Sequence, residues 1–122
     1  MNGAAGRSEG EPVDRRQVAN LIENMEAEVN NGGFDQLFYN STGDNTAETI
    51  QALETIGAFA MADILKRAAA KFPGGTPPKD RFARQEILLQ ISPNAEAFEE
   101  LDGEFYGYPD DLADLLAKHS SS

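Results

Sequence analysis

The sequence predicts an all-α protein that folds as a single compact domain of about six helices. Apolar residues recur at steps of three and four residues through most of the chain, the period of an amphipathic helix. No segment shows the sustained alternation of a half-buried strand, and clusters of Gly, Pro, Asn and Ser separate the periodic segments. With 122 residues, of which 40% are hydrophobic, the chain is long enough to build one core.

The folded domain is predicted to span residues 13–119, behind a flexible, glycine-containing tail over 1–12. Asp14 and Gln17 form a capping pair for the first helix, and Val13 packs on Val18 as a hydrophobic staple. We expect this helix to end at 31–33, where a glycine can adopt the left-handed conformation. Its apolar stripe comprises Val18, Leu21, Ile22, Met25 and Val29.

Two more helices and a short one are predicted before the proline-rich loop at 73–78. A short helix over 34–40 places three apolar side chains on one side: Phe34, Leu37 and Phe38. Asn45 and Glu48 form a second capping pair, opening a helix that buries Ile50, Leu53 and Ile56. Gly57 separates it from a helix whose repeating apolar residues are Phe59, Ala62, Leu65, Ala69 and Phe72.

Three helices are predicted after the loop. The first is indicated by the spacing of Phe82, Leu88 and Ile91. Ser92 is the expected cap of the second, with Pro93 at its first helical position. Its buried face is formed by Phe98, Leu101 and Phe105. The last helix is expected to open at Pro109 and to dock through Leu112, Leu115 and Leu116.

The charge of the chain is strongly acidic and unevenly distributed. Its 21 acids and 10 bases give a formal net charge of −11, which opposes binding to nucleic acid or to an anionic membrane and favours a basic partner. The 49 residues between Arg16 and Lys66 contain eight acids and no base, and nine acids and no base lie between Arg84 and Lys118. Six of the bases fall within 66–84, so we expect an acidic surface with one separate basic region.

The densest acidic run is the candidate partner-binding site. On the predicted helix, Phe98, Leu101 and Phe105 fix the buried side, so the carboxylates point mainly outward and repel one another without a base in the run. Three interpretations stay open: a solvated acidic helix, a surface for a basic protein, or a divalent-cation surface, although no loop has calcium-binding spacing. The run comprises Glu96, Glu99, Glu100, Asp102, Glu104, Asp110, Asp111 and Asp114.

Catalytic, metal and cofactor chemistry are not indicated. The chain has no Cys, and its one histidine, His119, lies near the end of the last helix. No Gly-x-Ser-x-Gly, Ser-x-x-Lys or phosphate-loop pattern is present. We therefore expect no enzyme, no cofactor and no metal site. No apolar stretch has the length of a signal peptide core or a membrane span, which predicts a cytoplasmic protein.

One segment carries a family resemblance. Residues 30–40, NNGGFDQLFYN, are followed by Gly43 and by the pairs Leu101-Asp102 and Phe105-Tyr106. Together with Ala52-Leu53 and Ile56-Gly57-Ala58, this pattern resembles a bacterial family of domains of unknown function over roughly 14–116. The described member of that family is an acidic DNA-mimic protein. The resemblance implies a helical homodimer that binds a helix-turn-helix transcription repressor in place of DNA.

The function predicted from these observations is an acidic protein-binding module that mimics DNA and occupies the DNA-binding surface of a basic transcription regulator. The double glycine and the aromatics behind it are interpreted as a structural corner between helices, so mimicry would rest on the acidic surface. Two alternatives remain: an immunity-type inhibitor of a basic nuclease toxin, and an interaction module whose acidity only confers solubility.

Overall fold

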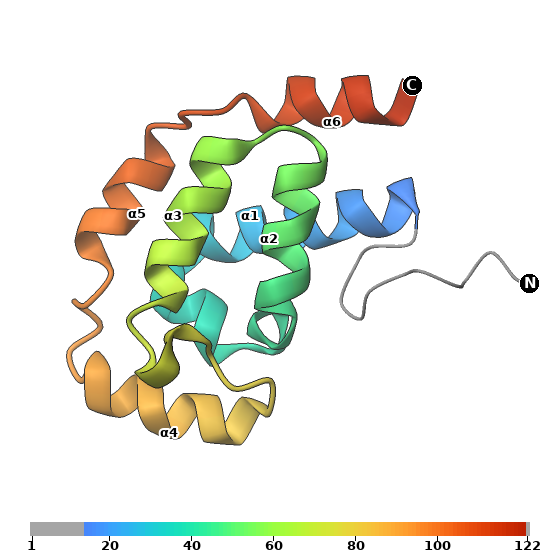
Figure 1. The fold of residues 1–122 in the computed structure, drawn as a ribbon. Helices are drawn as coiled ribbons and strands as arrows, with labels where there is room; N and C mark the ends of the chain where they lie inside the picture. Colours follow the sequence, from blue (N-terminus) through green and yellow to red (C-terminus); the bar gives the residue numbers. More distant parts are fainter. Residues whose placement is uncertain (1–13, 122) are drawn as a thin grey trace, which may run out of the picture.

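The computed structural model describes residues 14–121, and within them the chain is helical and has no strand (Figure 1). The all-α prediction is confirmed. The predicted tail over 1–12 and the staple residue Val13 lie outside the described residues. The elements are α1 (Arg15–Tyr39), the 3₁₀ helix η1 (Ser41–Asn45), α2 (Thr46–Thr55), α3 (Phe59–Ala69), the 3₁₀ helix η2 (Pro73–Gly75), α4 (Arg81–Ile91), α5 (Glu99–Tyr106) and α6 (Leu112–Ser121).

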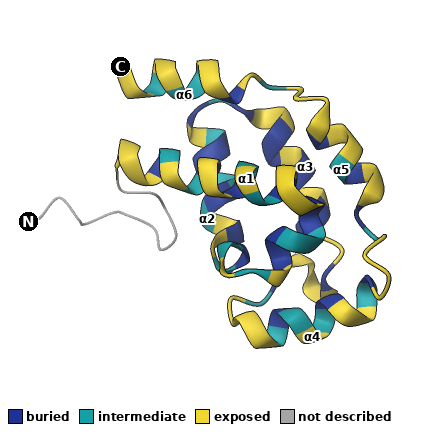
Figure 2. Cartoon of the chain, turned by 180° about the vertical axis from the view of Figure 1, so that it is seen from behind, coloured by how far each residue is buried: buried dark blue, intermediate teal, exposed yellow. Residues whose placement is uncertain are grey.

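The helices surround one core. In both views α2 and α3 lie side by side against α1, with α4 at one end of the molecule and α6 at the other (Figures 1 and 2). The chain from the end of α4 to the start of α6 follows one edge, and α5 lies within this stretch. The buried faces of α1, α2 and α3 point toward one another, and α5 covers the remaining side by packing on α1 and α3 (Figure 2).

Helix α1 begins and bends where the sequence indicates. Its first turn is capped by Asp14, whose Oδ1 accepts the backbone N–H of Gln17 at 2.7 Å. The expected end at the double glycine is a kink inside one continuous element, with Gly33 at φ 74°. A Cβ at Gly33 would lie 2.5 Å from the carboxylate of Asp102, so this position excludes any side chain.

Phenylalanines from distant segments form the centre of the core. The ring centroid of Phe38 lies 4.9 Å from that of Phe72 and 5.4 Å from that of Phe98. The ring centroids of Phe34 and Phe105 lie 5.9 Å apart. Edge-to-face and tilted contacts of this kind add to the apolar burial. The aromatics behind the double glycine therefore connect the end of α1 to α5 and to the end of α3.

A buried arginine holds the turn that follows α1. Arg84 of α4 is fully buried, and all five of its guanidinium N–H groups are used. Nε donates to the carbonyl of Phe38 at 2.7 Å, and Nη2 donates to the carbonyl of Asn40 at 2.9 Å and to Asp44 Oδ1 at 2.7 Å. Nη1 donates to the carbonyls of residues 78 and 79 at 2.8 and 3.1 Å.

Two expected core residues and two expected helix starts are wrong. Phe59 and Phe82 are 66% and 75% exposed, because α3 and α4 bury other faces. No helix begins at Pro93: Ala95 takes a φ of 56°, which a helix cannot contain, and α5 starts only at Glu99. Helix α6 opens at Leu112 rather than at Pro109. Helix α2 begins directly after Asn45 as predicted, but the side chain of Asn45 forms no capping hydrogen bond.

Candidate protein-binding surface

The eight predicted partner-binding acids are distributed along the edge between α4 and α6. We call the stretch 96–114 the acidic edge (Figure 1). Glu96 precedes α5, and Glu99, Glu100, Asp102 and Glu104 lie within it. Asp110 and Asp111 occupy the connection to α6, and Asp114 lies in the first turn of that helix. The structure therefore places the stretch that carries all eight along one margin of the molecule.

Two of these acids bind backbone N–H groups of other helices. Asp102 Oδ1 accepts the N–H of Phe34 at 2.9 Å, just after the glycine kink of α1. Asp110 Oδ2 accepts the N–H of Met61 at 2.8 Å in the first turn of α3. Each carboxylate satisfies a donor that the helix itself leaves free, so both fix the acidic edge to the core. Burial raises the pKa of Asp102 and outweighs the Phe34 N–H bond, with nearby Asp35 and Glu99 adding to the rise.

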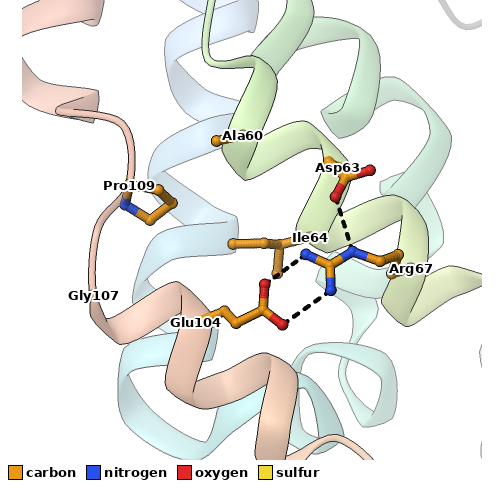
Figure 3. A pocket seen from close by; sticks show the side chains of 7 residues that line it. All are labelled: Ala60, Asp63, Ile64, Arg67, Glu104, Gly107 and Pro109. Atoms are coloured by element: carbon orange, nitrogen blue, oxygen red, sulfur yellow. Dashed lines mark hydrogen bonds and ion pairs between the residues drawn. The ribbon is translucent and has the colours of Figure 1, made fainter.

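Glu104 is neutralised by an arginine from α3. Its two oxygens accept Arg67 Nη2 at 2.6 Å and Nη1 at 2.9 Å, while Arg67 Nε donates to Asp63 Oδ2 at 2.8 Å (Figure 3). The bidentate bond from Arg67 lowers the pKa of Glu104. The expectation that no base relieves the acidic run is therefore wrong at Glu104, because the base comes from another helix. Asp114 likewise pairs with Lys118 at 2.9 Å.

Six of the eight acids have no ion pair among the described residues. Two of the six, Asp102 and Asp110, are the half-buried acceptors described above. The other four are Glu96, Glu99, Glu100 and Asp111. All four are exposed. Asp111 uses one carboxylate oxygen to accept the N–H of Asp114 at 3.1 Å, which caps α6 and leaves its charge at the surface. Glu99 and Glu100 lie in the first turn of α5, where the helix dipole favours negative charge. These four carboxylates are the part of the predicted site that faces solvent without a cation.

Four of the six bases in the predicted basic region form ion pairs with acids of other parts of the described chain. Lys66 binds Glu54 at 2.6 Å, and Lys79 binds Glu48 at 2.9 Å. Arg84 binds Asp44, and Arg67 binds Asp63 as well as Glu104. The bases of 66–84 thus neutralise half of the eight acids in the first base-free stretch. Of these bases the second stretch receives only Arg67, and Lys118 pairs with Asp114 at its end, so most of its negative charge remains.

The sequence of the chain matches one protein-family model. The family model of DMP19-like proteins matches residues 12–121, which is nearly all of the helical domain. The chain belongs to the DMP19-like family. The match includes residues 30–40, which we call the corner segment, as well as α5 and the acidic edge. It extends the resemblance seen over 14–116 at both ends. A comparison with curated proteins and with solved structures gave no match.

In this DMP19-like protein the corner segment is a hydrogen-bonded structural unit. Glu28, which the sequence reasoning did not single out, is its central acceptor: Oε1 accepts Gln36 Nε2 at 2.7 Å and Asn40 Nδ2 at 3.1 Å, and Oε2 accepts the Thr42 hydroxyl at 3.0 Å. Burial acts to raise the pKa of Glu28, but these three bonds and the charge of Arg81 outweigh it and lower the pKa. The amide-rich sequence of the segment is the signal that could have pointed to such an acceptor.

The described part of the DMP19-like chain contains neither a metal-binding cluster nor a membrane-spanning helix. Among residues 14–121 no group of three or more His, Cys, Asp or Glu side chains is placed to hold a metal ion. The same residues include no helix that has both the length and the hydropathy to cross a membrane.

Proposed function

We propose that this chain is a non-catalytic DNA mimic, whose acidic edge occupies the DNA-binding surface of a basic transcription regulator. The observation that carries the proposal is the match to the DMP19-like family over 12–121. The exposed, unpaired carboxylates of the acidic edge support it, because they give the family resemblance a surface through which mimicry can act.

The acidic edge has the features that a phosphate-like surface requires. DNA-binding proteins position themselves largely by contacts from Lys and Arg to phosphates, of which each strand places one per about 3.4 Å of the helix axis. Neighbouring side chains on a helix surface lie about 5–6 Å apart at Cβ, so outward carboxylates offer a comparable array. The caps made by Asp102 and Asp110 fix the backbone that carries Glu99, Glu100 and Asp111. The surface is thus ordered before a partner arrives.

Capture followed by competition tests the proposal. The immobilised full chain is exposed to a lysate of its source cell at low salt, bound proteins are eluted with a salt gradient, and each is then purified and titrated. The proposal expects a basic DNA-binding regulator that duplex DNA displaces from the chain. A nuclease whose activity the chain blocks would instead support an immunity-type inhibitor. The absence of any salt-released protein would contradict both functions.

Charge reversal at single positions locates the contact. We expect Glu99→Lys and Glu100→Lys each to weaken regulator binding by about tenfold or more, with the larger loss at low salt. Glu23→Lys is the matched control, because Glu23 is exposed on α1 and the change in net charge is identical. Glu104 is left intact, since its reversal would also break the bond to Arg67. Equal losses in all three variants would show that only total charge matters and would contradict a specific acidic edge.

A further inference from the structure

A second exposed surface, on α4, is apolar rather than acidic. Phe82 and Leu89 are 75% and 65% exposed, and they lie seven residues apart on one side of the helix. Tyr39, at the end of α1, is about half exposed and lies beside them. We call Tyr39, Phe82 and Leu89 the α4 face. Large apolar side chains scattered singly are ordinary on a protein surface, whereas a gathered group with hollows indicates an interaction site.

Two adjoining hollows give the α4 face its shape. One has a volume of about 530 Å³ and is lined by Tyr39, Phe82 and Leu89 together with polar residues of α4. The other has a volume of about 470 Å³ and continues from Tyr39 and Leu89 to the turn at Ser92–Ala95. Tyr39 and Leu89 line both, so the hollows form one groove along the outer side of α4. Helix α4 lies at the end of the molecule, where its outer side meets solvent (Figure 2).

The polar rim of this groove is acidic. Asp35 lines one hollow, and Asp80 and Glu86 line the other; neither hollow is lined by Lys or Arg. Arg81, which lies on the same helix, directs its guanidinium to the carbonyl of Tyr39 at 3.1 Å and to Asn40. Two copies of this chain that met through the groove would bring these acids together within molecules of net charge −11. The charge therefore disfavours a second copy and favours a basic occupant.

From this combination we infer that the α4 face docks a basic, amphipathic helix of a partner protein. The apolar side of that helix fills the groove against Tyr39, Phe82 and Leu89, while its Lys and Arg side chains reach Asp35, Asp80 and Glu86. The inference goes beyond the proposed mimicry and does not depend on it. An acidic surface alone attracts many DNA-binding proteins about equally, because they all bind duplex DNA through positive charge. An apolar groove, which duplex DNA lacks, would let this chain select the one partner that carries a matching amphipathic helix.

A designed peptide provides the test. The probe is a fluorescent Leu/Lys helix of about 18 residues with leucines at three- and four-residue steps. Its control has each Leu replaced by Ser, so that only the apolar side changes. With the full chain, anisotropy titrations are expected to show binding of the Leu/Lys peptide at least about tenfold tighter than of the control. Equal affinity for both peptides would mean attraction by net charge only and would overturn the inference.

Substitutions on the chain locate the binding. We expect Leu89→Ser and Phe82→Ser each to weaken peptide binding by about tenfold. Phe59→Ser should leave it unchanged, because Phe59 is 66% exposed on α3 and lines neither hollow. Glu86→Lys should weaken binding more than Glu23→Lys, which changes the net charge equally. All of these side chains are exposed, so circular dichroism should show unchanged folding.

Two further results would overturn the inference. One is peptide binding that Phe59→Ser weakens as much as Leu89→Ser. The other is a dimer of the unmodified chain in sedimentation that Leu89→Ser and Phe82→Ser dissociate, because the groove would then be an interface between copies. Neither result bears on the proposed DNA mimicry, since Glu99→Lys and Glu100→Lys test that function at a different edge.

Discussion

At the scale of single residues, Arg84 is the side chain on which the local fold depends most. A buried cation is tolerated only when its donors are satisfied, and here five N–H groups bond to four carbonyls and one carboxylate. The same guanidinium explains Gly43: a Cβ there would lie 2.8 Å from Arg84 Nε and 2.8 Å from the carbonyl of Leu37. One residue of α4 thus determines the turn that ends α1.

Replacing Arg84 with lysine should be severely destabilising. The ammonium group has three donors and no planar fork, so several buried carbonyls would lose their partner. We expect Arg84→Lys to lower the free energy of unfolding by about 3 kcal/mol. Arg81→Lys, an exposed position on the same helix, should change it by less than about 0.5 kcal/mol. Urea unfolding followed by circular dichroism measures both, and equal midpoints for the two variants would refute the role given to Arg84.

Sequence reasoning could not find this role. Arg84 counts there as one more base in a cluster, because a pattern of charges does not show which cation the fold encloses. Phe82 shows the opposite error: its spacing from Leu88 and Ile91 suggested a buried position, yet α4 turns Arg84 and Leu88 inward instead. Asp102 and Asp110 were predicted to belong to an acidic surface. The local sequence does not indicate that these carboxylates accept backbone N–H groups from α1 and α3, which lie far from them in the chain.

At the scale of elements, the position of α5 depends on carboxylates that reach other helices. Asp102 joins α5 to the second half of α1, Asp110 joins the following connection to α3, and Glu104 joins α5 to α3 through Arg67. The apolar contacts of Leu101 and Phe105 supply the burial. A helix of eight residues would not persist in water alone, so these bonds and contacts hold it in place.

Removal of one of these caps should be measurable. We expect Asp102→Ala to lower the free energy of unfolding by about 1 kcal/mol, the usual cost of losing a helix cap. Asp102→Asn should cost less, because its side-chain oxygen can still accept the N–H of Phe34 and no charge is buried. Glu99→Ala, exposed on the same helix, serves as the control and should have little effect. Thermal denaturation distinguishes the three variants, and equal losses for Ala and Asn would contradict the cap.

Helical periodicity predicted most elements correctly. It failed at residues 92–98, where a sequence typical of a helix start forms a turn. The stripe of α1 and its bend at the double glycine follow from apolar spacing and glycine alone. The stretch 92–98 has a serine, a proline and helix-forming residues, so it was predicted to begin a helix. In the structure Ser92 accepts the N–H of Ala97 at 3.1 Å within a turn, and this turn returns Phe98 to the core. The long-range aromatic contacts of Phe98 prevailed over local preference.

At the scale of the whole molecule, charges that are segregated along the sequence are partly brought together by the fold. The ten bases are too few for 21 acids, and the fold assigns most of the central bases to the first base-free stretch. The second stretch, which supplies the acidic edge, keeps most of its negative charge. Self-repulsion in a chain of net charge −11 opposes the compact state, so stability should respond to both salt and pH.

The pH dependence follows from three carboxylates whose pKa values shift in opposite directions. Burial raises the pKa of Asp35 despite a bond from Ser92, and it raises that of Asp102, both from an ordinary value of 3.8. Their folded states bind a proton more tightly than the unfolded chain, so their contribution is present below pH 3.8 and is lost as the pH rises through their folded-state pKa values. Glu28 behaves oppositely: its contribution is present above pH 4.5 and is lost as the pH falls through its lowered pKa.

We therefore expect stability to be greatest at mildly acidic pH, above the range in which Glu28 is protonated and below neutrality. Lowering the pH from about 7 to about 5 should raise the urea midpoint, because protonation begins at the carboxylates whose pKa is raised and reduces self-repulsion. Adding salt at neutral pH should raise it as well, since screening weakens repulsion between exposed acids. Glu99→Lys should show a smaller salt response than the unmodified chain. A urea midpoint that is lower at pH 5 than at pH 7, or insensitive to salt in both proteins, would show that the excess negative charge does not limit the stability of this fold.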